Sequence, residues 1–203
     1  MLDRIPGGTD PQGAVSLLRF KLAMMTRQPD KALAAIAQSP AWLMTRWEHS
    51  VVPLSLLRGQ ALAAKGDAAA RSEFLAAEKQ LQELLKNSEQ AADAQSYLGL
   101  AYAGLGRKQE ALKAARAAVE ILPMSRDVIV GAFHLERLAY VEAQVGEAQG
   151  ATEHLDQLLS SPGGETVSVA TMQIDPVWDP IRDDARFKRL LAKYRSGDKT
   201  AAR

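Results

Sequence analysis

A spaced series of glycines limits the folds open to this chain. Gly66, Gly106 and Gly146 follow one another at intervals of forty residues, each between stretches rich in helix-forming residues. Gly106 is predicted to supply the positive φ that ends one helix and opens a turn. A helix–turn–helix unit cannot bury its apolar side alone, so a repeated unit predicts a stack with one continuous core.

The segment 92–125 carries the pattern in its most complete form. Three small residues, Gly99, Ala111 and Ala118, are predicted to stand where two antiparallel helices cross, because only small side chains allow a close approach. Two larger residues four apart fill the space on one helical face, and a proline stops the second helix. The marker positions are Leu98, Gly99, Tyr102, Gly106, Ala111, Ala115, Ala118 and Pro123.

Further units are predicted near residues 13–40, 52–87 and 126–160. The chain holds 35 Ala and 26 Leu but only 17 Val plus Ile, so helix formers far outnumber the β-branched residues of a sheet. The predicted fold is all-α, an α-solenoid of antiparallel helix pairs in residues 1–160.

A different pattern begins after Ser160. Prolines and glycines predict a linker with turns over residues 161–182, containing at most a short helix from Val167 to Gln173 with Thr166 as its cap. Asp183 is predicted to cap a final helix over residues 183–195, which covers the open end of the stack. Its apolar stripe consists of Phe187, Leu190, Leu191 and Tyr194. Trp178 is expected beneath this helix, and residues 196–203 are expected to be disordered.

The composition removes several classes of function. There is no cysteine, which excludes disulfides, cysteine-based zinc sites and thiol nucleophiles. The net charge of +1 offers no general attraction for nucleic acid or an anionic membrane. No signal peptide and no apolar run long enough to cross a bilayer are present, so a cytoplasmic location is expected. Leu2 to Ile5 look like the end of a helix whose start is absent, which suggests a piece of a longer protein.

The marker positions of residues 92–125 resemble the tetratricopeptide repeat family, and the resemblance extends over about residues 13–160, or about four such units. The family implies a superhelical scaffold that binds a protein or peptide segment in a concave groove, without a cofactor. The segment 174–191 also resembles the ending of tetratricopeptide regions in bacterial multidomain signalling proteins. This second likeness leaves open a regulatory segment of a larger Ser/Thr kinase, nucleotide cyclase or winged-helix transcription regulator.

The family's groove positions can be carried over to the first helix of each unit. The candidate groove residues are Leu56, Gln60, Ser96, Leu100, Phe133, Glu136 and Tyr140. Members that bind a carboxylate at a partner's C-terminus use Lys, Arg and Asn at such places. The residues here differ, which argues against that class of ligand.

The side chains that could suggest chemistry have structural explanations. The three histidines have no carboxylate at a spacing that assembles a metal site on a helix, and they are expected at the surface or in the groove. Asp183 and Asp184 are explained by a helix cap and a first-turn acid. No phosphate-binding loop or nucleophile elbow occurs, so an enzyme is not expected and no catalytic, cofactor or metal residues are assigned.

Two further features remain open at the level of sequence. Trp42 and Trp47 could form an adhesive patch or pack between the first two units. The basic segment from Arg186 to Arg203 could touch acidic partners but is more typical of a solvated helix face. Self-association through an uncapped N-terminal end is a third possibility.

Overall fold

The computed structural model describes residues 10, 12–44, 51–86, 90–161 and 167–195, and most of them are helical. The helices are α1 Ala14–Met25, α2 Pro29–Ile36, α3 Leu54–Ala64, α4 Ala70–Leu84, α5 Ala91–Gly104, α6 Lys108–Ile121, α7 Val130–Gln144, α8 Ala148–Ser160, α9 Val169–Ile174 and α10 Ala185–Arg195, with a 3-10 helix η3 Pro176–Ile181 and strands β1 Trp42–Met44 and β2 Val51–Pro53. The all-α class is therefore confirmed.

Helices α1 to α8 form packed pairs of neighbours, α1 with α2, α3 with α4, α5 with α6 and α7 with α8. One turn geometry joins the members of every pair. Gly66, Gly106 and Gly146 have φ of +72°, +74° and +81°, as the sequence predicts, and Arg27 takes the same place in the first pair with φ +56°. The next residue's N–H reaches back five residues to a helix carbonyl in all four turns, for example from Arg107 to Tyr102 at 2.9 Å. The shared pattern is a Schellman motif.

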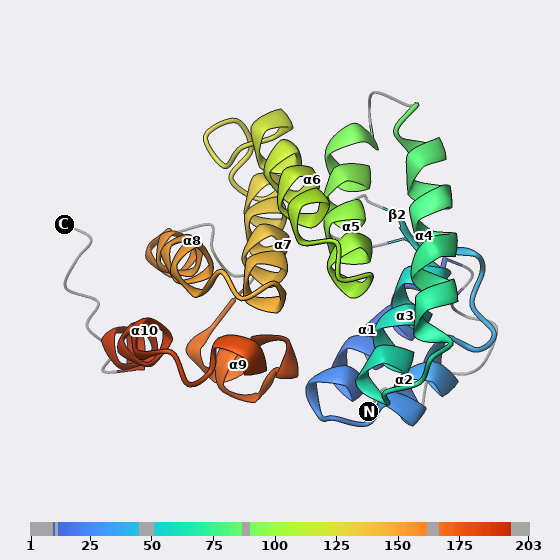
Figure 1. Ribbon diagram of the computed structural model, residues 1–203, viewed down its shortest axis with the longest axis horizontal. Coiled ribbons are helices and arrows are strands. Elements are labelled where there is room, and N and C mark those ends of the chain that lie inside the picture. Colours follow the sequence, from blue (N-terminus) through green and yellow to red (C-terminus); the bar gives the residue numbers. More distant parts are fainter. Residues whose placement is uncertain (1–9, 11, 45–50, 87–89, 162–166, 196–203) are drawn as a thin grey trace.

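Successive pairs also pack against one another. Helix α4 contacts α5, and α6 contacts α7. The first helices of successive pairs also touch, because α3 contacts α5 and α5 contacts α7. Within the central pair the helices approach closely, since a Cβ on Gly99 would lie 3.0 Å from that of Ala115 and 3.2 Å from the Ala111 carbonyl oxygen. In Figure 1 the chain runs from the blue first pair through α4, α5 and α6 to α8; helix α9 then lies on the side of α1, whereas α10 lies beside α8.

A two-stranded antiparallel ribbon joins the first pair to the second. No strand was predicted here from the sequence. Strand β1 pairs with β2 in the register Trp42 with Pro53, Leu43 with Val52 and Met44 with Val51. Leu43 and Val52 are buried, so the ribbon places their side chains in the helical core and leads directly into α3. In β2, Val51 is half-buried while Val52 and Pro53 are buried, and β-branched valine is favoured in such strands.

The C-terminal segment packs on the array, which corrects the prediction of a linker over residues 161–182. Helix η3 contacts α7, and α10 contacts α8. Trp178 is only 1% exposed, and its ring centroid lies 6.1 Å from that of Phe187 on α10, as expected. The segment is irregular because two prolines shorten its helices, and its buried side chains fix it in place.

Both predicted caps in this segment were wrong. Helix α9 begins after Ser168, whose hydroxyl accepts the Thr171 N–H at 3.1 Å in a reciprocal capping box, while Thr166 lies outside the described residues. Helix α10 begins after Asp184, whose Oδ1 accepts the Arg186 N–H at 2.7 Å. The neighbouring Asp183 instead accepts a bond from Lys188 at 2.8 Å. The predicted tail 196–203 also lies outside the described residues.

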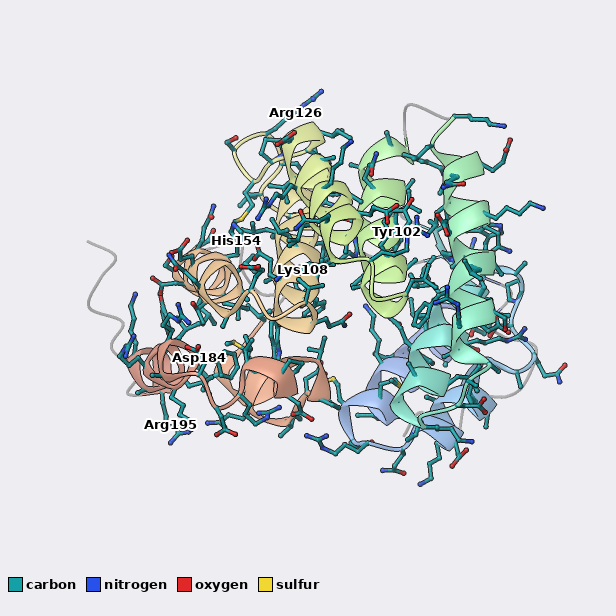
Figure 2. All side chains as sticks on the ribbon, in the orientation of Figure 1. Tyr102, Lys108, Arg126, His154, Asp184 and Arg195 are labelled. Carbon is teal, nitrogen blue, oxygen red and sulfur yellow. The ribbon has the colours of Figure 1, made fainter. Side chains whose placement is uncertain are left out.

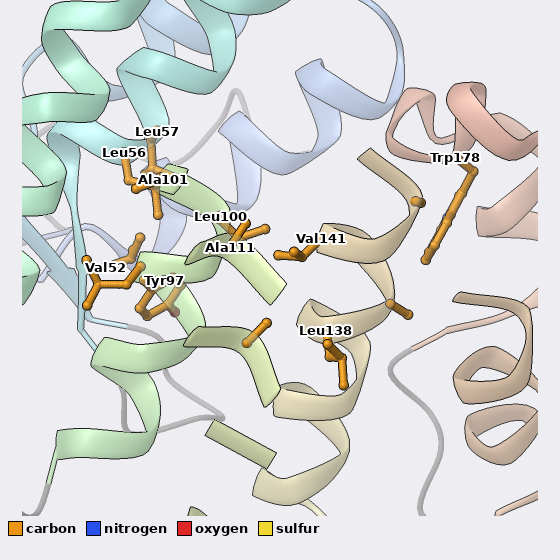
Figure 3. Close-up of a cluster of buried hydrophobic side chains, with 14 of the residues drawn as sticks. Val52, Leu56, Leu57, Tyr97, Leu100, Ala101, Ala111, Leu138, Val141 and Trp178 are labelled. Atoms are coloured by element: carbon orange, nitrogen blue, oxygen red, sulfur yellow. The ribbon is translucent and has the colours of Figure 1, made fainter. Parts of the chain in front are cut away.

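One buried cluster extends from α1 to α10 and includes side chains from the ribbon. Figure 3 shows Val141 on the side of α7 that faces Leu100 of α5, and Trp178 on the opposite side of α7. The core therefore runs on both sides of α7. Among the described helices, none is both long enough and apolar enough to cross a bilayer.

Candidate binding surface

The seven candidate groove residues lie on α3, α5 and α7, but three of them are buried, which corrects their assignment as contact residues. Leu56 and Leu100 belong to the core cluster, and Ser96 has no exposed surface. The physical reason is that α3, α5 and α7 pack against one another along this side. Side chains at the junctions fill the space between helices and cannot contact a partner.

The remaining candidates are partly exposed and divide into two places. Gln60 lies on α3, whereas Phe133, Glu136 and Tyr140 lie on α7. The Tyr140 hydroxyl donates to Glu136 Oε1 at 2.6 Å. Burial, followed by the charge of the Glu136 carboxylate, raises the pKa of Tyr140 well above its ordinary value. Tyr140 therefore keeps its proton, and its hydroxyl donates the hydrogen bond to the Glu136 carboxylate.

The chain's own C-terminal segment covers part of this surface. The ring centroid of Trp178 lies 4.8 Å from that of Tyr140, with the rings tilted by 54°. Such tilted contacts between aromatic rings are favourable beyond the apolar area that they bury. The groove position at Tyr140 is thus filled from within the molecule.

An ion pair ties the same segment to the first helix pair. Arg27 Nη1 and Nη2 donate to Asp179 Oδ2 and Oδ1 at 2.7 and 2.9 Å. The hydrogen bond from Arg27 holds the pKa of the Asp179 carboxyl below its usual value. Arg182 supports this arrangement from the other side, because its Nε donates to Asp179 Oδ1 at 2.8 Å and its Nη2 to the Asp175 carbonyl at 2.7 Å.

A buried polar cluster joins α5 to α7. Ser96 Oγ lies 2.8 Å from His134 Nδ1, and both residues are buried. Arg137 Nη2 donates to the Tyr97 hydroxyl at 2.9 Å, and its guanidinium carbon lies 4.4 Å from the centre of the Tyr97 ring. Asp93 Oδ1 lies 3.7 Å from Arg137 Nη1. These directional contacts fix the register between the two helices.

Of the two described histidines, His134 differs from its prediction as a surface or groove residue. His134 is buried in the cluster just described. His154 on α8, labelled in Figure 2, places Nδ1 2.7 Å from Oε2 of Glu142 on α7. Glu142 is buried, and a Cβ on Gly150 would lie 2.7 Å from its Oε1, so the absence of a side chain at Gly150 makes room for the carboxylate. His49 lies outside the described residues.

Other candidate features are accounted for by local contacts. In the described part of α10, Lys188 bonds Asp183, Lys193 bonds Asp156 and Arg186 bonds Asp184. No group of three or more His, Asp or Glu side chains in the described ranges lies close enough together to hold a metal ion.

Trp42 lines an open hollow of about 890 Å³ beside α4. Its side chain is half-buried and packs on the core cluster. Two lysines, Lys79 and Lys86, stand around the hollow. Trp47, the other half of the suggested adhesive patch, lies outside the described residues.

Sequence reasoning missed the contacts that join separate units. Tyr97 and Arg137 were not assigned, although they stand forty residues apart and therefore occupy the same place in successive units. That spacing was a usable signal. The pair of Arg27 and Asp179 had no such signal, because it depends on how the C-terminal segment returns to the first turn.

No family model, curated protein or solved structure matches the chain.

Proposed function

We propose that this protein is a non-enzymatic scaffold of the tetratricopeptide type, which binds a protein or peptide segment along the side formed by α3, α5 and α7. The supporting observation is the repeated unit itself. Four helix pairs in the described part share one turn geometry, and the later pairs pack through their first helices. An array built in this way presents a preformed surface, so the entropic cost of binding falls mainly on the partner.

The accessible part of this surface suggests the partner's chemistry. Gln60 offers an amide, Phe133 an aromatic ring and Glu136 a carboxylate. A cluster of Lys, Arg and Asn suited to a terminal carboxylate does not stand at the seven candidate positions. We therefore propose an internal segment of mixed polar and apolar character as the ligand, lying along α3 and the start of α7, where the C-terminal segment leaves room.

Site-specific photocrosslinking tests this proposal. A photoreactive phenylalanine analogue placed at Gln60 or at Phe133 is expected to capture the same partner segment from cells. The matched control is the same analogue at Leu75, a large residue on α4 that is exposed in the free chain. Equal capture from Leu75, or different partners from Gln60 and Phe133, would contradict binding on the proposed side.

A further inference from the structure

One face of the first helix recurs in every unit. Each turn has one residue with positive φ, which is Arg27, Gly66, Gly106 or Gly146. The positions twelve, nine and five residues before it lie on this face, which is named the joining face below. In the later units these positions are Leu54, Leu57 and Ala61 on α3, Ala94, Tyr97 and Ala101 on α5, and His134, Arg137 and Val141 on α7. All nine are buried.

On α7 the joining face packs against the pair before it. On α7, His134 contacts Ser96 and Arg137 contacts Tyr97, and both partners belong to the preceding first helix α5. Figure 3 shows Val141 turned toward Leu100 of the same helix. Helix α5 in turn packs on both α3 and α4.

The joining face of α1 is open in the described chain. Its residues are Val15, Leu18 and Leu22, of which Leu18 is 53% and Leu22 52% exposed. Partly exposed Met25 continues the row by one more turn. The opposite side of α1 is buried through Leu17, Phe20 and Ala23, so the helix is apolar on both sides.

The row Val15, Leu18, Leu22 and Met25 has the spacing of three, four and three residues that helices use to pack side by side. The spacing is the same when the row is read in the opposite direction. If a second α1 runs antiparallel, Leu18 faces Leu22 of the second copy, and Val15 faces Met25 of the second copy. Two identical copies related by a two-fold axis can therefore bury this row in one contact.

The other end of the array is closed to stacking. Helix η3 lies on α7, and α10 lies on α8, where a following pair would otherwise pack. Head-to-tail growth of a filament is thus blocked, and a contact between two α1 helices leaves both copies with covered ends. We propose that the joining face of α1 is a homodimer interface, with a second copy of this chain as its occupant.

Molecular mass in solution tests the proposal. Light scattering over a concentration series is expected to show a rise toward twice the monomer mass. Leu18→Glu and Leu22→Glu should each raise the dimer dissociation constant at least tenfold, because a carboxylate would be buried in an apolar contact. Leu75→Glu on α4 is the matched control and should behave as the unaltered chain does. Circular dichroism checks that all variants keep their helix content.

Cysteine crosslinking tests the antiparallel arrangement, and the chain's lack of cysteine keeps the reaction clean. A mixture of Leu18→Cys and Leu22→Cys proteins should form disulfide-linked dimers several-fold faster than either protein alone. Equal rates in all three samples would overturn the two-fold antiparallel pairing.

Two mass results would overturn the proposal as a whole. One is a constant monomer mass at all concentrations for the full chain. The other is a dimer that forms only after residues 1–9 are removed, because this would show that the chain's own N-terminal segment occupies the face. Neither result bears on the crosslinks from Gln60 and Phe133, so this inference and the proposed function fail independently.

Discussion

Arg27 and Asp179 lie 152 residues apart in the chain, yet two nitrogens of one side chain bond the two oxygens of the other at 2.7 and 2.9 Å. The contact joins the first turn of the array to the segment that covers its last pair. Arg27 has a φ of +56° at the turn position that is glycine in the three later turns. The backbone strain of a non-glycine residue is thus accompanied by a contact that glycine cannot make.

Two substitutions of Arg27 separate these effects. Arg27→Ala keeps a side chain in the left-handed region and loses the ion pair, so it is expected to lower the melting temperature. Arg27→Gly also loses the pair but relieves the backbone, so it should lower the melting temperature less or raise it. Thermal unfolding at low and high salt provides the check. In 1 M salt the unaltered protein should approach Arg27→Ala, because salt screens an exposed pair; an unchanged gap would contradict the role of charge.

The Phe74 ring sets the approach of α4 to the helices on either side of it. A Cβ on Gly104 of α5 would overlap this ring, and a Cβ on Gly59 of α3 would lie 2.8 Å from it. Gly104→Ala is therefore expected to destabilise the protein by about 1–3 kcal/mol through overpacking, even though alanine is the better helix former. Chemical denaturation measures the loss. In the background of Phe74→Leu the same substitution should cost less, and an equal cost would show that the ring is not the cause.

The hydrogen bond between Arg137 and Tyr97 is predicted to stabilise the contact of α7 with α5. Tyr97→Phe keeps the ring beneath the guanidinium and removes only the hydroxyl, so the expected loss is about 1–2 kcal/mol of unfolding free energy. Tyr102→Phe is the matched control, because no hydrogen bond of its hydroxyl supports an inter-pair contact in the described chain. Similar losses for the two variants would remove the special role of Tyr97.

The cap of α10 predicts a pH dependence. Hydrogen bonds from the Arg186 side chain and backbone lower the pKa of Asp184 from its ordinary 3.8 to about 2. Because the folded value is depressed, the stabilisation is fully present above about pH 4 and is lost as the pH falls toward 2. An NMR titration of the carboxyl carbon should give the low value in the folded chain. A value near 3.8 would show that Asp184 does not cap the helix.

The sequence predicted those parts of the fold that follow from local spacing. Gly66, Gly106 and Gly146 identify three turns because the left-handed backbone selects glycine within a few residues of each helix end. Gly99 and Ala111 identify a close helix crossing for a similar reason, since side-chain size alone decides it. The contact between Trp178 and Phe187 also followed from an apolar stripe beside a large aromatic residue.

Features that depend on the rotation of one helix pair against another were not predicted. Ser96 and Leu100 were assigned to a groove, but the approach of α7 to α5 buries both. Leu43 and Val52 occupy a ribbon whose pairing brings together residues on either side of the undescribed segment 45–50. Asp183 was predicted to cap the last helix and Asp184 to be a first-turn acid, but the helix starts one residue later and Asp184 accepts the Arg186 N–H.

Hydrogen exchange of the protein with and without its crosslinked partner segment examines the scaffold proposal at the level of individual helices. The proposal predicts added protection in α3 and at the start of α7, with little change in α4 and α6. Protection confined to α4 and α6, or to the hollow beside Trp42, would contradict binding along the side formed by α3, α5 and α7.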